Sequence, residues 1–119
     1  MRAECRARVN DVAGAKADLE TLRKSRMSVG DATVTITDPA EMLKFVLDER
    51  IREFALQGHR WLDMRRLSTD PLFAGKTYTH QVLSKTGEVI TSFPLKAERF
   101  TFRIPGKIMD INPGTVNNP

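Results

Sequence analysis

Apolar residues in the first part of the chain recur at the three- and four-residue spacing of an amphipathic helix. The clearest run lies between Val12 and Leu22. Residues 1–9 alternate between apolar and polar, as a strand would, but they consist mostly of Ala, Glu and Arg, which favour helix. Asn10 and Asp11 separate the two runs, and Asp11 suits the N-cap of the second helix. The pattern predicts a short helix, a tight turn and a second helix, a hairpin of the tetratricopeptide type.

A long helix is expected after a polar connector over residues 25–37. Asp38 suits the N-cap, Pro39 the first helical position, and Glu41 the reciprocal position of a capping box. The helical spacing continues to about Gln57 and places apolar side chains on two sides, which is typical of a helix packed between other elements. The main side comprises Leu43, Leu47, Ile51, Phe54 and Ala55, and the opposite side comprises Phe45 and Leu56.

The helical pattern is interrupted once and then gives way to turns. Gly58 breaks the long helix, and a second helical segment is expected from His59 to about Leu67. Two β-rich runs flank a Gly-containing turn over residues 78–93, which is compatible with a small β-hairpin. Residues 100–105 are expected to be extended, and residues 110–119 consist of turn-forming types.

These elements predict a mainly α-helical fold. Its helical part, residues 1–67, combines a tetratricopeptide-like helical hairpin with a long broken helix. The loop-rich part, residues 68–119, carries the small hairpin and is expected to pack on the helical part. The whole chain, residues 1–119, is therefore expected to form a single domain.

The composition is that of a globular protein with a small positive net charge. Of the 119 residues, 40% are apolar and 29% charged, as in folded proteins, and the net charge is +4. Basic residues are interleaved with acidic ones, a pattern that does not favour nucleic-acid binding. No apolar run approaches the roughly 20 residues of a membrane span, and no signal-peptide core follows Met1. The single cysteine, Cys5, cannot form an internal disulfide, and we expect it to be a small core residue.

The densest set of ionisable side chains lies between Asp48 and Arg66. Glu49 and Glu53 share one helix face and could act as an acid/base pair, or bind a metal ion together with His59. Arginines lie among these carboxylates, however, and so much adjacent positive charge disfavours a metal site. The two-histidine spacing of helical zinc proteases is also missing. We therefore interpret the stretch as a structural network and not as an active site.

The same spacing predicts particular contacts within this network. Arg52 follows Asp48 by four residues and Glu49 by three, so either carboxylate can pair with it. His59 precedes Asp63 by four residues, which suits a hydrogen bond that fixes the imidazole ring.

Trp61 has two interpretations. It could offer a stacking surface for a carbohydrate, or it could pack in the interior, and its apolar neighbours favour packing. We predict no catalytic residue, no cofactor and no metal site, and we assign no ligand-binding residue. The predicted structural network consists of Glu49, Arg52, Glu53, His59, Arg60, Trp61 and Asp63.

One long segment matches a known family pattern. Residues 49–66 read ERIREFALQGHRWLDMRR. They are similar to the segment E-R-x-R-E-[FL]-A-x-E-G-H-R-W-x-D-[LM]-R-R of the SusD/RagB family of outer-membrane nutrient-binding lipoproteins. One difference is Gln57, where the family usually has Glu.

Two weaker matches flank this segment in the family's order. Residues 2–8 and 18–23 resemble the last tetratricopeptide-like hairpin of the family. Ile104-Pro105, residues 110–113 and the ending Asn117-Asn118-Pro119 resemble its P-I-P…E-I-D-x-N-P…x-Q-N-P ending. The resemblance covers nearly the whole chain, except for the insert near residues 76–93.

The resemblance implies a mostly α-helical, non-catalytic protein on the surface of Bacteroidetes-type bacteria. Such a protein is anchored in the outer membrane through a lipidated N-terminal cysteine and caps a SusC-like TonB-dependent transporter. It captures glycans or other nutrients for import. This chain is then expected to be the C-terminal portion, and its only link to the membrane is an anchor upstream of it, so Cys5 is not the lipidated residue.

Two other functions stay open on the residues alone. One is a free-standing tetratricopeptide-like module that binds another protein through its helical hairpin. The other is a small enzyme that uses Glu49, Glu53 and His59.

Overall fold

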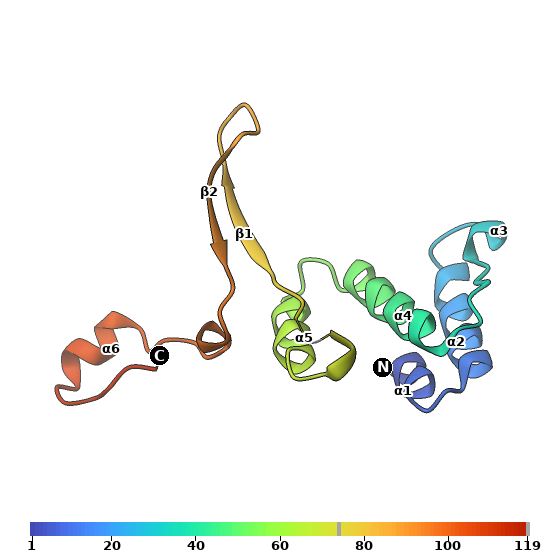
Figure 1. The fold of residues 1–119 in the computed structure, drawn as a ribbon, viewed down its shortest axis with the longest axis horizontal. Coiled ribbons are helices and arrows are strands. Elements are labelled where there is room, and N and C mark those ends of the chain that lie inside the picture. Colours follow the sequence, from blue (N-terminus) through green and yellow to red (C-terminus); the bar gives the residue numbers. More distant parts are fainter. Residues whose placement is uncertain (74, 119) are drawn as a thin grey trace. The chain divides into compact units, whose positions relative to one another are not determined.

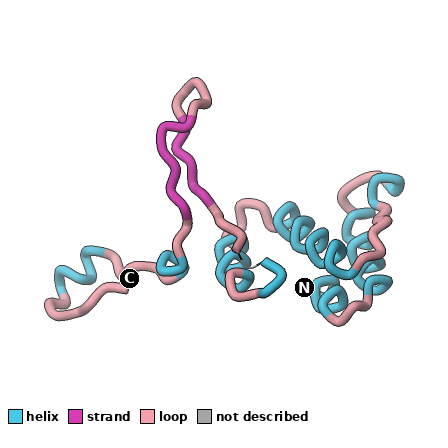
Figure 2. Tube along the Cα trace, in the orientation of Figure 1, coloured by secondary structure: helices cyan, strands magenta, loops and turns pink. Residues whose placement is uncertain are grey.

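The computed structural model describes residues 1–73 and 75–118 and divides the chain into two compact units, Met1–Arg60 and Trp61–Pro119. The described part is mainly helical and carries one small antiparallel hairpin, so the predicted fold class is confirmed (Figures 1 and 2). The helices are α1 (Arg2–Arg8), α2 (Val12–Lys24), α3 (Val29–Ala32), α4 (Pro39–Glu53), α5 (His59–Leu67) and α6 (Gly106–Ile111), and the strands are β1 (Thr79–Leu83) and β2 (Val89–Pro94).

The first two helices form the predicted helical hairpin. Asp11 caps α2, because its Oδ1 accepts a hydrogen bond of 2.9 Å from the backbone N–H of Gly14. In α1 the buried residues are Glu4 and Ala7, whereas Cys5 is exposed. The expectation that Cys5 is a core residue is therefore wrong. Positions 4 and 7 share a helix face at the 3.6-residue period, and position 5 points away from that face.

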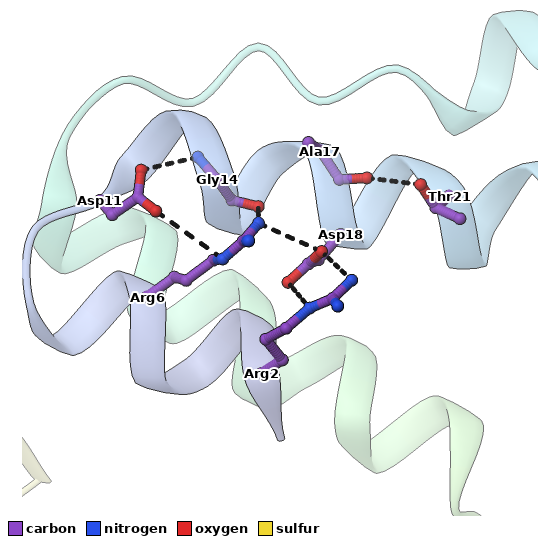
Figure 3. A network of polar contacts seen from close by, with 7 residues as sticks. All are labelled: Arg2, Arg6, Asp11, Gly14, Ala17, Asp18 and Thr21. Carbon is purple, nitrogen blue, oxygen red and sulfur yellow. Dashed lines mark hydrogen bonds and ion pairs between the residues drawn. The ribbon is translucent and has the colours of Figure 1, made fainter.

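Hydrogen bonds and ion pairs of charged side chains link α1 to α2 (Figure 3). Arg2 donates two hydrogen bonds to the carboxylate of Asp18, at 2.6 and 2.9 Å. Arg6 Nη1 donates to the carbonyl oxygen of Gly14 at 2.9 Å and lies 3.3 Å from Asp18 Oδ1. A Cβ atom at Gly14 would collide with the side chains of Asp11 and Arg6, so this close approach requires glycine.

The connector before α4 contains more structure than the sequence suggests. Residues 29–32 form the one-turn helix α3, whose first turn is capped by Ser28 Oγ accepting from the N–H of Asp31. Ala32 and Val34 are both buried and belong to the core of the first unit. A single turn of helix is too short to show a period in the sequence, which is why the pattern did not reveal it.

Helix α4 begins as predicted and ends earlier. Asp38 Oδ1 accepts from the N–H of Glu41 at 2.8 Å, which confirms the N-cap. The carboxylate of Glu41 accepts a hydrogen bond from Lys44 Nζ at 2.8 Å, a partner outside the predicted capping box. The helix ends at Glu53 and does not reach Gln57.

The early end of α4 changes which apolar residues are buried. Leu56 adopts a left-handed conformation (φ 63°), as does Gly58 (φ 77°), and a right-handed helix cannot continue through such residues. Leu56 is consequently 106% exposed in the turn and does not form an apolar side of the helix. The buried apolar residues of α4 are Met42, Leu43, Val46 and Leu47, of which the pattern predicted Leu43 and Leu47.

The second unit holds the predicted hairpin. Strands β1 and β2 are antiparallel, with His80 opposite Phe93 and Val82 opposite Thr91. All residues of both strands are exposed. Helix α5 spans His59–Leu67, as expected.

The tail folds back on itself through side-chain amides. Asn117 accepts from the N–H of Ile104 at 2.8 Å and donates to the carbonyl oxygen of the same residue at 3.0 Å. Asn118 donates to the carbonyl oxygen of Phe102 at 2.8 Å. Between these segments lies α6, a helix that the sequence pattern did not predict, and Pro119 lies outside the described residues. That residues 68–119 pack on residues 1–67 stays a prediction.

Candidate functional site

Glu49 is the buried centre of the predicted charged network. Its side chain is 8% exposed, and Oε2 accepts from Arg52 Nη1 at 2.8 Å and from Arg23 Nη1 at 2.9 Å. The predicted pair between Glu49 and Arg52 is thus confirmed. Arg52 makes no ion pair with Asp48 in the part of the chain that the structure describes.

Arg23 is the residue of this network that sequence reasoning missed. Its guanidinium pairs with Glu49 and also donates to two carbonyl oxygens at the end of α3, those of Asp31 (2.7 Å) and Ala32 (3.3 Å). It lies 5.4 Å from the centre of the Phe45 ring, within cation–π range. One side chain from α2 therefore fixes both α3 and α4. Its only signal in the sequence is a basic residue in the last turn of α2, which many helices have.

Glu53 is held by a second arginine from outside the motif. Arg26 donates to both carboxylate oxygens of Glu53, at 2.7 and 3.2 Å. This hydrogen bond lowers the pKa of Glu53 below its ordinary value, against the opposing effect of desolvation. Hydrogen bonding from Arg2 lowers the pKa of Asp18 in the same way. Both carboxylates are therefore ionised at neutral pH.

His59 and Asp63 have partners other than one another. The His59 ring meets the Phe54 ring edge-on, with 4.9 Å between centroids. Asp63 is buried, and its Oδ1 accepts a hydrogen bond from Arg66 Nε at 2.8 Å. Arg60 is half-buried at the second position of α5.

Trp61 is the centre of an aromatic cluster in the second unit. Its ring stacks on Phe102, with centroids 5.4 Å apart and planes inclined by 27°, and tilts against Phe100 at 5.8 Å. Its Nε1 is buried without a hydrogen-bond partner among the described residues. Phe102 remains 72% exposed, so most of its surface stays accessible to solvent despite the stacking.

The residues of the alternative enzyme hypothesis are not brought together as an acid/base or metal site. Glu49 pairs with arginines, Glu53 with Arg26, and His59 packs on an aromatic ring. Within residues 1–73 and 75–118, no three His, Cys, Asp or Glu side chains are grouped so that they could hold a metal ion. No helix of the described residues has the length and apolar character needed to cross a membrane.

A groove in the first unit is a concave surface that could hold a ligand. Its volume is about 410 Å³, within the range of small-molecule sites. Helices α1, α2 and α4 and the turn after α4 line it. Its apolar lining comprises Met1, Ala3, Leu19, Leu22, Val46 and Phe54, and its charged lining comprises Arg2, Glu4, Asp18, Glu49, Arg50 and Glu53.

Aromatic and charged groups both line this groove. The Arg50 guanidinium lies 5.0 Å from the centre of the Phe54 ring, and the Glu53 carboxylate, also in the lining, pairs with Arg26. An apolar ring beside charged hydrogen-bonding groups suits a ligand that has both an apolar face and hydroxyl groups.

Comparison with known proteins identifies the family. The family model described as the SusD family matches residues 1–119. No curated protein and no solved structure gives a significant match. Members of the SusD family are in general binding proteins of the bacterial cell surface and not enzymes. Because the match spans the whole length of the sequence, this chain belongs to the SusD family.

Proposed function

We propose that this chain is part of a SusD-like lipoprotein that captures glycans or other nutrients at the surface of the bacterial outer membrane. The captured nutrient passes to a SusC-like TonB-dependent transporter, and a lipid anchor upstream of this chain holds the protein at the membrane. The observation that carries the proposal is the family match over residues 1–119. The pairing of Glu49 and Glu53 with arginines supports a binding role without catalysis.

Within this chain, we place the glycan in the groove of the first unit. The C–H face of a sugar ring can pack on Phe54, and its hydroxyls can bond to carboxylates and to Arg50. The ion pairs of Asp18 and Glu53 keep their carboxylates charged and fixed in position, so little side-chain entropy is lost on binding.

Affinity electrophoresis through gels that contain one soluble polysaccharide each tests the proposal. We expect at least one polysaccharide to retard the protein and to remain uncleaved. Phe54→Leu should abolish most of the retardation. Phe102→Leu, which removes an exposed aromatic ring of the second unit, is the matched control and should leave it unchanged.

Each other result has a definite meaning. Retardation lost in Phe102→Leu and kept in Phe54→Leu would place the sugar on the aromatic cluster and not in the groove. Shortened sugar products would support the enzyme hypothesis. Free migration with every polysaccharide would contradict glycan capture by this chain.

The transporter is tested separately by size-exclusion chromatography. We expect the protein to co-elute with a SusC-like transporter in detergent micelles and not with an unrelated TonB-dependent transporter. Separate elution from both would remove the transporter from the proposal and leave nutrient binding intact.

A further inference from the structure

The two free edges of the β1–β2 hairpin differ in regularity. The register passes from Val82 opposite Thr91 to Leu83 opposite Val89, so Ile90 is an extra residue on β2. Strand β2 is therefore the bulged strand, and β1 is regular throughout. Strand β2 also ends in Pro94, which has no N–H group to donate.

Hydrogen bonds at the two ends of the hairpin show which backbone groups of β1 point outward. At one end Leu95 N–H donates to the carbonyl oxygen of Tyr78, and at the other Ser84 N–H donates to that of Glu88. Inward and outward residues alternate along an antiparallel strand. Positions 80 and 82 therefore face β2, and the N–H and C=O groups of Thr79, Gln81 and Leu83 point away from it.

The outer edge of β1 has none of the usual protection against strand pairing. Native proteins shield exposed edges with charges, prolines or bulges. Strand β2 has the bulge and the proline, whereas β1, with the sequence THQVL, has neither and carries no Asp, Glu, Lys or Arg. All five of its residues are exposed. A lone two-stranded hairpin is only marginally stable in water, so an added strand would stabilise it.

We propose that the outer edge of β1 pairs with β1 of a second copy of this chain. Antiparallel pairing about a two-fold axis at Gln81 sets Gln81 opposite its own copy and Thr79 opposite Leu83. All three outward residues of each strand then find backbone partners. No formal charge on β1 opposes its copy, although each chain carries a net charge of +4.

The same asymmetry limits the assembly to two chains. Pairing through β1 leaves only the β2 strands at the edges of the resulting four-stranded sheet. Those edges are interrupted by the bulge at Ile90 and by Pro94. The contact is thus closed by its two-fold symmetry and does not propagate into a fibre.

Sedimentation equilibrium of the full chain, over concentrations up to about 1 mM, tests the proposal, because so small an interface is expected to be weak. We expect reversible dimers. Gln81→Lys should lower the dimerisation constant roughly fivefold or more, since it places two like charges opposite one another. Ser92→Lys is the matched control: Ser92 is the cross-strand neighbour of Gln81 and lies on the protected edge. It adds the same charge and should leave dimerisation unchanged.

A charge-swap mixture tests the position of the two-fold axis. Gln81→Lys and Gln81→Glu should each dimerise poorly alone, and an equal mixture should dimerise better than either. Amide exchange of the hairpin at low concentration verifies that each variant keeps the hairpin. A monomer at every concentration, equal damage from Ser92→Lys, or no gain on mixing would overturn the proposal.

Discussion

The two units of this chain are stabilised by different means. In Met1–Arg60, nine apolar side chains are buried. Ion pairs link the segments around them, of which Arg23–Glu49 is largely buried and Arg26–Glu53 is more exposed. In Trp61–Pro119, Leu67 is the one buried apolar side chain among the described residues. That unit relies on an aromatic cluster, a hairpin ladder and the side-chain amides of Asn117 and Asn118. Burial of a large apolar side chain contributes several times more to the free energy of unfolding than one such hydrogen bond. The first unit should therefore be the more stable one.

The largest expected loss of stability comes from a substitution in the core of the first unit. Met42 is fully buried, and Met42→Ala should lower the free energy of unfolding by about 3 kcal/mol, measured by urea denaturation and far-UV circular dichroism. Leu62→Ala, in an exposed position of the second unit, should change it by less than about 0.5 kcal/mol. Similar losses from the two variants would remove the contrast between the units.

The second-largest loss of stability is expected from removing Arg23, the arginine that links α2 to α3 and α4. Arg23→Met leaves Glu49 buried with only Arg52 as a charged partner, and we expect a loss of about 2 kcal/mol in the same assay. Lys24→Met removes the same charge from the adjacent exposed position and should have little effect. Equal, small effects would show that the Arg23 contacts do not stabilise the unit.

The aromatic cluster of the second unit should contribute less. Phe102→Ala removes the ring stacked on Trp61 and should cost about 1 kcal/mol. Trp61 is the only tryptophan, so its fluorescence reports this unit directly, and its emission should shift as the ring becomes more exposed. Phe93→Ala, on the hairpin, should leave the emission unchanged.

The amide of Asn117 should have a smaller effect still. Asn117→Ala removes both the acceptor for the N–H of Ile104 and the donor to its carbonyl oxygen, and we expect a loss of about 0.5–1 kcal/mol. Faster hydrogen exchange at the Ile104 amide is the measurement. Unchanged protection there would show that the amide does not hold the tail.

The smallest expected effect is the loss of stability of the first unit at low pH. The pKa values of Asp18 and Glu53 are lowered in the folded state by arginine partners, so their contribution to stability is present at neutral pH. It should disappear as the pH falls below about 4 and through the lowered pKa values. Glu53→Gln should make the urea midpoint depend less on pH in that range. An unchanged pH profile in this variant would contradict the contribution of the ion pair.

Local chemistry explains what could be predicted from the sequence. The caps at Asp11 and Asp38 and the hairpin turn depend on neighbouring residues, and each lies where expected. The roles of Arg23 and Arg26 could not be predicted, because their carboxylate partners lie 26 and 27 residues away. The end of α4 was missed because the left-handed conformation of Leu56 has no signature in its residue type.

The close approach at Gly14 has a consequence for engineering. Replacing a helix glycine by alanine is a standard way to stabilise a protein, and it typically gains up to about 1 kcal/mol. At this position the added methyl group would displace both the cap of α2 and the arginine from α1 that reaches the same turn. A rule that treats each helix in isolation would therefore choose the wrong residue here, because this glycine belongs to the contact between two helices as much as to its own.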